Sequence, residues 1–461
     1  MMRNSRILQG ISVFSYAAFA TPLSQPQQAV INGRITPDKQ VGVGHFSEWS
    51  RATKKEFLID WQAGREDKWI FVQGNEGGDT DSMTAALTWA YHLGHATQNT
   101  SDPLKAIALL QTPTHALDLR PENKKALENS KMTAGHEDLL TIDELPEDPE
   151  TLSRKLRGIV LVDHAKPLRK WNDAKILSIF DHHKDEGAGK DADPRVFEKT
   201  ASCTTIVARQ MLDELEKLSE EYHMPHELLE LILSAIAIDS SGLKEEKSTK
   251  ADVETSKRVL ARSNWREKDL SEVMEGLDNQ LNGIRNALDH LGLRDLLRRD
   301  WKGDLVDTPS PQTPTISLGF ASIPYSFDEQ IEKTEFSELF DWFAIHAAWT
   351  AEMGVDISVC LNKYKIETED GTTDITEKKK IREIVLVVRD DVRIDAAQAD
   401  ALFKVAREAI EKAGKDGLLK ELKPWHNAPE LGVRQMVWTH ESDAGRKDIR
   451  PLVEEAVMTW D

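Results

Sequence analysis

Carboxylate and imidazole side chains follow four apolar segments of this chain. The groups are Asp79 and Asp81 after WIFV (69–72), Asp163 and His164 after GIVLV (158–162), Asp181, His182 and His183 after AKILSIF (174–180), and Asp239 after ELLELILSAIAI (227–238). A charged carboxylate at the end of a buried segment is costly unless it is paired or binds a cation. One such aspartate fits a helix cap, but four elements that end this way favour a shared metal site.

The loop GNEGGDTDS (74–82) raises the question of what it binds. Glycine-rich loops between a strand and a helix usually bind a phosphate at the helix N-terminus. Glu76, Asp79 and Asp81 would repel a phosphate unless a positive ion lies between the carboxylates and the phosphate. A divalent metal ion is the obvious candidate, so we expect a metal ion bound by this loop to contact the phosphate.

The five aspartates and up to two histidines, without cysteine, form a ligand set suited to Mg²⁺ or Mn²⁺. Their number is sufficient for two ions, an arrangement that recurs in phosphoryl hydrolysis. Taken singly, Asp79 and Asp81 would fit a helix cap and a turn, and His182 or His183 would fit a core histidine. His164 fits a structural role equally well. The joint pattern favours a metal centre.

Composition and charge limit the classes of function. The chain has 461 residues and a net charge of −20, which disfavours binding to nucleic acid or to an anionic membrane. Its two cysteines cannot build a disulfide framework or a thiolate cluster. Arg3, Arg6 and the pattern Ala18-Phe19-Ala20 fit a secretory signal peptide, a mitochondrial presequence or a disordered tail. This N-terminal run is too short for a membrane span, so no stable membrane insertion is expected.

The order of elements predicts an α/β protein. Between residues 45 and 245, apolar strands alternate with helices, and the expected helices cover 82–95, 204–218 and 227–238. This alternation predicts a doubly wound parallel sheet, with ligands beyond the carboxyl ends of its strands. An acidic stretch at 143–150 is an expected loop. A charged helical stretch covers 245–290.

The second half has a different pattern. Its expected strands are 315–323, 355–366 and 382–390, its helices are 336–352 and 396–413, and GTTDITEKKK (371–380) is a hairpin-type loop. We therefore predict a targeting-like or disordered segment at 1–44, a catalytic metal-binding domain at 45–289, and a smaller substrate-binding α/β domain at 290–461.

The motifs GNEGGDTDS, VDH, DHH and the aspartate of AIAIDSSG occur in the order of the four motifs of the DHH phosphoesterase superfamily. From about residue 45 onward the chain resembles the fungal exopolyphosphatase branch, whose relatives are the manganese-dependent inorganic pyrophosphatases and the animal prune proteins. The second half resembles the DHH-associated C-terminal domain. The resemblance implies a mixed sheet there, an active site in the cleft between the domains, and a cytoplasmic location.

The resemblance also implies roles for individual residues. The implied metal ligands are Asp79, Asp81, Asp163, His182 and Asp239, with Asp163 bridging two Mn²⁺ or Mg²⁺ ions. The implied holders of substrate phosphates are His183, Lys302, Arg446 and Lys447. Asp181 would be a further ligand or would orient a ligand imidazole, and it joins Asp163 and His183 in the expected catalytic set. Asn75 is placed with the substrate-binding residues. It stands where the pyrophosphatases have a metal-binding histidine and where the exopolyphosphatase and prune branches have asparagine.

The activity implied is removal of the terminal phosphate from linear inorganic polyphosphate, by attack of a water that bridges the two metal ions. Alternatives are an inorganic pyrophosphatase, a cyclic-nucleotide or short-chain phosphodiesterase, and a prune-like interaction protein with weak activity. Arg294, Arg298, Arg299, Arg434 and Arg450 are candidates for binding a polyphosphate chain, or equally ordinary salt-bridge partners. The sequence leaves the oligomeric state open, and a monomer is one of the choices.

Overall fold

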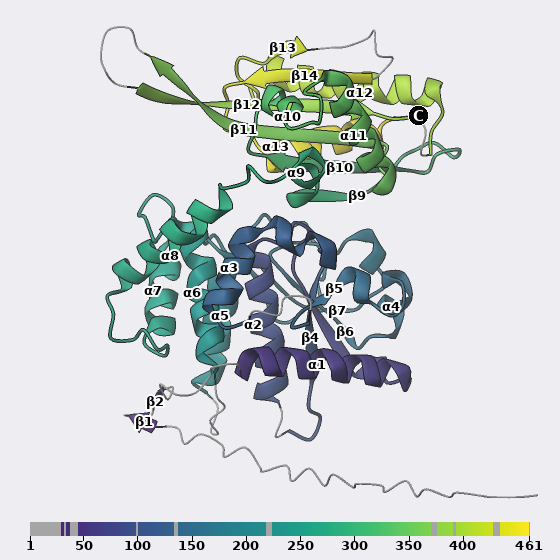
Figure 1. Ribbon diagram of the computed structural model, residues 1–461. Helices are drawn as coiled ribbons and strands as arrows, with labels where there is room; N and C mark the ends of the chain where they lie inside the picture. Colours follow the sequence, from purple (N-terminus) through teal and green to yellow (C-terminus); the bar gives the residue numbers. More distant parts are fainter. Residues whose placement is uncertain are drawn as a thin grey trace, which may run out of the picture.

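The computed structural model describes residues 29–31, 34–36, 45–97, 100–132, 137–217, 224–369, 376–390, 393–426 and 434–460. Most of the predicted targeting-like segment therefore lies outside the described residues. Among the helices that are described, none has the length and apolar character needed to cross a membrane. Two sheets, each covered by helices, lie one above the other in Figure 1.

The first sheet is entirely parallel and has the strand order β5-β4-β3-β6-β7-β8. Its strands are β3 (Trp69–Gln73), β4 (Lys105–Leu110), β5 (Leu140–Thr141), β6 (Gly158–Val162), β7 (Ile176–Asp181) and β8 (Arg195–Phe197). The helices and 3-10 turns between them are α1 (His45–Gln62), η1 (Glu66–Lys68), α2 (Thr80–Ala96), η2 (Thr114–Leu119), α3 (Pro121–Asn129), η3 (Ile142–Glu144), α4 (Pro149–Lys155) and η4 (Arg169–Trp171).

Alternate residues of β3 point to opposite faces of this sheet, as strand geometry requires. Ile70 and Val72 join a core beneath the helices α2, α5 (Cys203–Leu215) and α6 (His226–Ser240). Trp69 and Phe71 join a second core on the other face, beneath α1 and α4. Burial on both faces explains why these strands are continuous apolar runs in the sequence.

The second sheet is mixed and has the order β13-β14-β12-β11-β10-β9. Its strands are β9 (Trp301–Asp307), β10 (Thr315–Ile323), β11 (Ile357–Glu369), β12 (Thr376–Val388), β13 (Lys423–His426) and β14 (Arg434–His440). Only the pair β10–β11 is parallel among the described pairings of this sheet. One face packs on α12 (Ala396–Lys415) and α13 (Arg446–Met458), and the other on α9 (Leu293–Arg299), α10 (Phe327–Glu332) and α11 (Leu339–Glu352).

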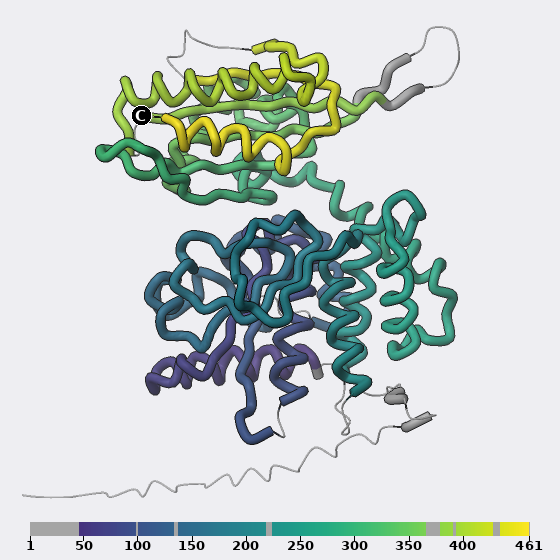
Figure 2. The backbone as a smooth tube through the Cα atoms, turned by 180° about the vertical axis from the view of Figure 1, so that it is seen from behind, coloured from purple at the N-terminus to yellow at the C-terminus, as the bar shows by residue number. Residues whose placement is uncertain are grey.

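The two sheets are joined by α7 (Lys250–Leu260), α8 (Leu270–Arg285) and α9. Ala116 and Leu119 of η2 lie in the same apolar core as Leu293 and Leu297 of α9, so the second unit packs directly on a turn of the first. Figures 1 and 2 show the connection at one side of the molecule, where the hairpin β11–β12 also extends beyond the sheet.

These observations confirm the predicted fold class of a doubly wound parallel sheet followed by a mixed α/β unit. The boundaries at 45 and 290 stay predictions. Two local expectations differ from the structure. The stretch 143–150 contains the start of α4, because Asp148 caps that helix and Pro149 begins it. Residues 376–380 of the expected hairpin loop belong to β12, which pairs with β11 as far as Glu369.

Candidate metal centre

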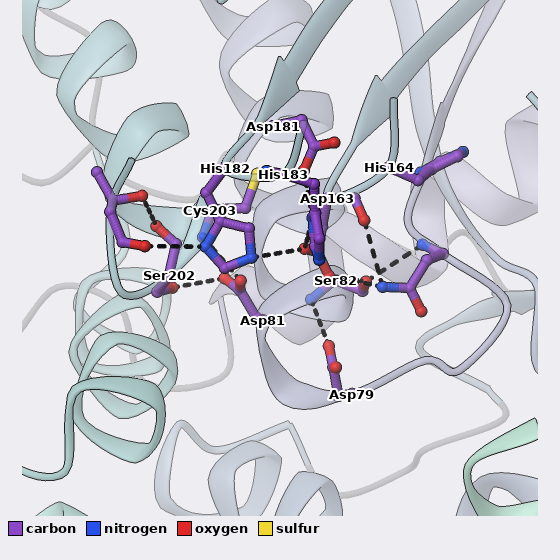
Figure 3. Close-up of polar contacts among 12 residues, drawn as sticks. Asp79, Asp81, Ser82, Asp163, His164, Asp181, His182, His183, Ser202 and Cys203 are labelled. Carbon is purple, nitrogen blue, oxygen red and sulfur yellow. Dashed lines mark hydrogen bonds and ion pairs between the residues drawn. The ribbon is translucent and has the colours of Figure 1, made fainter. Parts of the chain in front are cut away.

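Asp163 lies directly after β6 and at the centre of the predicted site. Its backbone has a φ of 61°, a left-handed conformation that costs energy for an aspartate and is concentrated at functional sites. Its Oδ2 accepts hydrogen bonds from Ser82 Oγ at 2.5 Å and from Asn75 Nδ2 at 2.7 Å. The glycine-rich loop therefore fixes one oxygen of Asp163 and leaves Oδ1 toward the two histidines (Figure 3).

Asp181, His182 and His183 continue directly from β7 and bring their side chains to Asp163. The potential ligand atoms of these four residues all lie within 4.8 Å of one another. His182 donates from Nδ1 to the Thr200 carbonyl at 3.1 Å, while its Nε2 lies 3.3 Å from Asp163 Oδ1. This arrangement orients Nε2 as the ligand atom of a neutral imidazole.

His183 is held by its neighbour rather than by Asp163. Asp181 Oδ1 accepts from the His183 backbone N at 3.1 Å and from His183 Nδ1 at 2.7 Å. Asp181 thus orients the imidazole of His183, whereas His182 is oriented by a backbone carbonyl. The other oxygen of Asp181, Oδ2, is buried without a hydrogen-bond partner among the described residues. A buried carboxylate oxygen in that state fits a cation.

Asp79 and Asp81 follow β3 and have separate local roles. Asp79 caps α2 by accepting from Ser82 N at 3.0 Å with Oδ1. Asp81 accepts four hydrogen bonds from the start of α5: its Oδ1 from Ser202 Oγ, Thr204 N and Thr204 Oγ1, and its Oδ2 from Cys203 N. The first backbone N–H groups of the helix start ASCTTIV (201–207) are therefore bound by a carboxylate.

Asp239 enters the site from the last turn of α6. Burial raises its pKa well above the ordinary value, and the charges of Asp81, Asp79 and Asp163 raise it further. Burial likewise raises the pKa of Asp81 to about 6, with Asp163 as the next cause. The four aspartates thus form one repulsive group that lacks sufficient positive charge of its own.

The pKa of His182, the basic partner of these aspartates, is raised as well. Burial alone would lower the pKa of His182, but the hydrogen bond to Asp163 and the charges of Asp81, Asp163 and Asp181 raise it to about 10. In the absence of metal, a proton on His182 thus supplies part of the missing charge. Oxygen and imidazole ligands around an excess of negative charge fit Mg²⁺ or Mn²⁺. The roles of individual residues as ligands stay predictions.

These shifts predict how pH acts on the metal-free protein. Because the folded-state pKa of Asp81 is raised to about 6, its contribution to stability is present near pH 4 and is lost as pH rises through 6. A divalent ion reverses this loss because it binds the ionised carboxylates. We expect Mn²⁺ to raise the melting temperature more at about pH 7.5 than at about pH 5, as measured by calorimetry. An equal rise at both pH values would contradict this.

The second unit reaches the loop through β9. A Cβ atom added to Gly77 would lie 3.0 Å from Cε of Lys302, so the lysine lies against the loop backbone. No carboxylate within the described residues forms an ion pair with Lys302. Burial raises the pKa of Asp163, but nearby positive charges lower it below its ordinary value. These are His182, which also hydrogen-bonds to Asp163, together with His183 and Lys302. Lys302 therefore lies close to the predicted metal ligands.

Arg446 is the first residue of α13 and binds Asp300, two residues before Lys302. Its guanidinium donates to the Asp300 carbonyl and to Asp300 Oδ1, both at 3.0 Å. Asp300 also pairs with Arg120 of the first unit at 3.3 Å. The structure thus brings Arg446 to the place where the two units meet, while Lys447 is exposed and has no ion pair in the described part of the chain.

Comparisons with known proteins place these residues in a family. The model of the DHH family, N-terminal domain, matches residues 69–236, and that of the DHHA2 domain matches residues 279–456. A Schizosaccharomyces pombe protein named "Putative exopolyphosphatase" is 31% identical over 56% of this chain and 67% of its own length. The chain belongs to the DHH family.

A second curated relative and one solved structure are also similar to this chain. A Lactobacillus gasseri protein named "Probable manganese-dependent inorganic pyrophosphatase" is 26% identical over 44% of this chain and 59% of its own length. The chain thus spans less than two thirds of that relative. The solved structure of a Methanococcus jannaschii "putative family II inorganic pyrophosphatase" has a TM-score of 0.52 and 18% identity, and covers 84% of this chain and 99% of its own. That likeness shows the fold alone.

Four of the five arginines considered for a polyphosphate path have carboxylate partners in this DHH-family chain. The pairs are Arg294–Glu352, Arg299–Glu122, Arg434–Asp390 with Asp400, and Arg450–Glu454. Arg298 differs because it is 8% exposed and has no ion pair within the described residues. The salt-bridge interpretation therefore fits four of them.

Sequence reasoning missed three contributors to the site. Ser82 donates to Asp163, Thr204 donates to Asp81, and Asp300 holds Arg446. Ser82 lies within GNEGGDTDS (74–82) and Asp300 within RRDWKGD (298–304), but their partners are far away in the sequence. Asn75 uses its amide group on Asp163 and accepts from Gly77 N at 2.9 Å. Its expected contact with substrate stays a prediction.

Proposed function

We propose that this protein is a metal-dependent exopolyphosphatase that removes the terminal phosphate from linear inorganic polyphosphate. The observation that carries the proposal is the meeting of two opposite charge groups. Asp163, Asp181, His182 and His183 lie together, and Lys302 of the second unit lies against the glycine-rich loop that holds Asp163. Arg446 is held close to Lys302 by its bond to Asp300. Metal ions held by the first unit and cationic side chains of the second unit suit the binding and hydrolysis of a phosphoanhydride. Relatives named as an exopolyphosphatase and as pyrophosphatases support this reaction class.

Two divalent ions, Mn²⁺ or Mg²⁺, fit the ligand set of Asp79, Asp81, Asp163, His182 and Asp239. When bound, such ions lower the pKa of an attacking water and neutralise charge on the phosphoryl oxygens. The protein's own contribution is to hold these ligands in place. Ser82 and Asn75 fix Asp163, residues 202–204 fix Asp81, and the Thr200 carbonyl fixes His182.

The remaining residues act on the substrate. His183 is held through Nδ1 by Asp181, which leaves Nε2 for a phosphate oxygen or for a proton on the leaving group. Lys302 and Arg446 stabilise charge on the transferring phosphoryl group and on the leaving chain. Because these two cations come from the second unit, a change in how the units pack would change the rate.

Inorganic pyrophosphatase is the second candidate, since relatives with that name match part of this chain. Asn75 favours the exopolyphosphatase, because it takes the place of a metal-binding histidine in the pyrophosphatases. Its amide hydrogen-bonds to Asp163 instead of adding a ligand. By the same resemblance we propose that the chain belongs to the exopolyphosphatase and prune-like branch.

The test is phosphate release by the purified full chain from long-chain polyphosphate, tripolyphosphate, pyrophosphate and a cyclic nucleotide. Each substrate is supplied with Mg²⁺ and with Mn²⁺, and Asp163→Asn protein prepared in parallel controls for contaminating phosphatases. Metal-dependent release from long chains, with pyrophosphate left over, is the expected result. Preference for pyrophosphate or for the cyclic nucleotide would overturn the assignment, and inactivity of a folded sample would favour the interaction protein.

A further inference from the structure

The hairpin β11–β12 carries two like-charge pairs directly opposite each other. In the antiparallel register, Lys363 pairs with Arg382 and Lys365 pairs with Lys380. Like charges in directly opposed positions destabilise a sheet. Two consecutive pairs of the same sign therefore carry a cost, which a bound anion would remove. We call these four residues the basic ladder.

The basic ladder lies on a defined face of the second sheet. Residues two apart on a strand share a face, so Leu361, Lys363 and Lys365 point the same way, as do Ile384, Arg382 and Lys380. Leu361 and Ile384 lie in the core beneath α12 and α13. The basic ladder thus continues the face that carries α13, beyond the end of the apolar core.

This position brings the basic ladder next to a residue of the proposed active site. A Cβ atom added to Gly445, the N-cap of α13, would lie 3.9 Å from Nη1 of Arg382. The next residue, Arg446, binds Asp300 beside Lys302. The ladder therefore approaches the first turn of α13, next to Arg446, one of the proposed phosphate-binding cations.

Two cations of the first unit, Lys247 and Arg285, also act on the basic ladder. Burial lowers the pKa of Lys363, and the charges of Lys380, Arg382, Lys247 and Arg285 lower it further. The leading charges on Lys363 are thus all positive. Arg285, at the end of α8, also acts on the pKa of Asp239 in the metal centre. Figures 1 and 2 both show the hairpin extending past the sheet on the side where α7 and α8 lie.

Within the described residues, few ion pairs join this group of cations to a carboxylate. The cations concerned are Lys247, Arg285, Lys363, Lys365, Lys380 and Arg382. Within the described residues, Asp443 is the one carboxylate that forms an ion pair with any of them, at 2.6 Å from Lys380 and 3.5 Å from Arg382. The Asp443 side chain is 88% exposed, so solvent weakens its effect. The chain as a whole has a net charge of −20, so this group of cations differs in sign from the protein's overall charge.

We propose that the basic ladder, with Lys247 and Arg285, binds the phosphates of a polyphosphate chain that lie distal to the phosphate being hydrolysed. This inference rests on the proposed function and adds the part of the site that recognises long chains. A linear polyphosphate carries negative charge on every phosphate, which matches a row of cations that starts beside Arg446. Pyrophosphate, held at the metal centre, is too short to reach the hairpin.

The same surface suits polyphosphate better than a nucleic acid. Single-stranded nucleic acids are bound by aromatic side chains that stack on the bases, together with basic residues. Tyr364, the aromatic residue between the two lysines of the ladder, lies on the opposite face, where its hydroxyl donates to Glu383. The ladder face therefore offers charge without a stacking platform at these positions.

The test reverses two charges of the ladder in the full chain. Lys363 and Lys365 are both exposed, so Lys363→Glu with Lys365→Glu should leave the core intact. The matched control is Lys175→Glu with Lys190→Glu, which makes the same change in net charge. Both control lysines are exposed, and Lys175 precedes β7 at the amino edge of the first sheet, away from the metal ligands.

The first readout is kcat/KM for long-chain polyphosphate and for tripolyphosphate, with metal present. The ladder variant should lose about tenfold or more on long chains, mainly through KM, since several charge-assisted contacts are lost. Its activity on tripolyphosphate should stay within about twofold of wild type, because the metal centre and Arg446 are unchanged. An equal loss on both substrates, or an equal loss in the control variant, would overturn the proposal.

The second readout does not depend on catalysis. Fluorescently labelled long-chain polyphosphate is titrated with protein in EDTA, and binding is followed by anisotropy at several salt concentrations. The ladder variant should bind more weakly, with a smaller dependence of log Kd on log salt concentration, and the control should match wild type. Absence of binding to wild type, unchanged binding by the ladder variant, or tighter binding of wild type to an RNA of similar length would overturn it. Wild-type inactivity on all substrates with ladder-dependent binding retained would instead fault the proposed function.

Discussion

Replacement of Asp163 by alanine is expected to abolish phosphate release while leaving the protein folded. Asp163 is the point where the glycine-rich loop, β6 and the two histidines of β7 meet, and its carboxylate is 3.3 Å from His182 Nε2. We expect kcat to fall by about 10³-fold or more, the range seen when a central catalytic group is removed. The fold should survive, because the loss of Asp163 relieves the repulsion on Asp81 and Asp239 and so offsets the hydrogen bonds from Ser82 and Asn75 that are lost.

Three measurements separate this outcome from a simple loss of structure. Calorimetry without metal should give Asp163→Ala a melting temperature close to that of wild type. Mn²⁺ should then stabilise the variant far less than it stabilises wild type, because a ligand is missing. Asp185→Asn is the matched control, since Asp185 lies near the end of β7 but is exposed and pairs with Arg195 outside the cluster. Near wild-type hydrolysis by Asp163→Ala would refute its central role.

Replacement of Lys302 by glutamine is expected to produce the second largest loss, about 10²-fold in kcat/KM, as for removal of one preorganised group that stabilises transition-state charge. Lys302 lies against Gly77 of the loop and acts on Asp163, yet no carboxylate in the described residues pairs with it. A cation without a partner beside a phosphate site is available to the substrate. Its loss should lower kcat as well as raise KM, because charge on the phosphoryl group grows in the transition state.

The effect of Lys302 can be distinguished from a change in the packing of the two units. Lys302→Arg retains the positive charge, so it should recover part of the activity lost in Lys302→Gln. The matched control is Lys175→Gln, which removes one exposed lysine at the opposite edge of the first sheet. Phosphate release from tripolyphosphate is the assay, because this short substrate depends least on the basic ladder. Equal activity of Lys302→Gln and wild type would remove Lys302 from the site.

The apolar pattern of the chain predicts which elements form and where the carboxylates lie along them. The strands WIFV (69–72) and 158–162, and the helix from residue 227, could be predicted because continuous burial on both faces leaves long apolar runs. The position of each aspartate at the carboxyl end of its element followed from the same reading. Parallel strands then place such residues at one edge of the sheet, so their convergence could be predicted without coordinates.

The hydrogen-bond partners of each carboxylate depend on tertiary packing. Asp81 caps α5, a helix 122 positions away from it in the sequence, and Asp163 takes its hydrogen bonds from a loop 81 to 88 positions away. Such contacts depend on the packing of elements that are distant in the chain, which local propensity does not encode. The same reason explains why four of five candidate arginines proved to be paired.

The basic ladder shows this division most clearly. The sequence contains Lys363, Lys365, Lys380 and Arg382, but part of this region resembled a loop because its lysines lack the apolar alternation of a half-buried strand. The register of β11 with β12 turns these residues into opposed pairs of like charge. The packing of the second unit on η2 of the first then brings them close enough for Arg285 to act on the pKa of Lys363. The four basic residues form one surface because the strands β11 and β12 pair in this register.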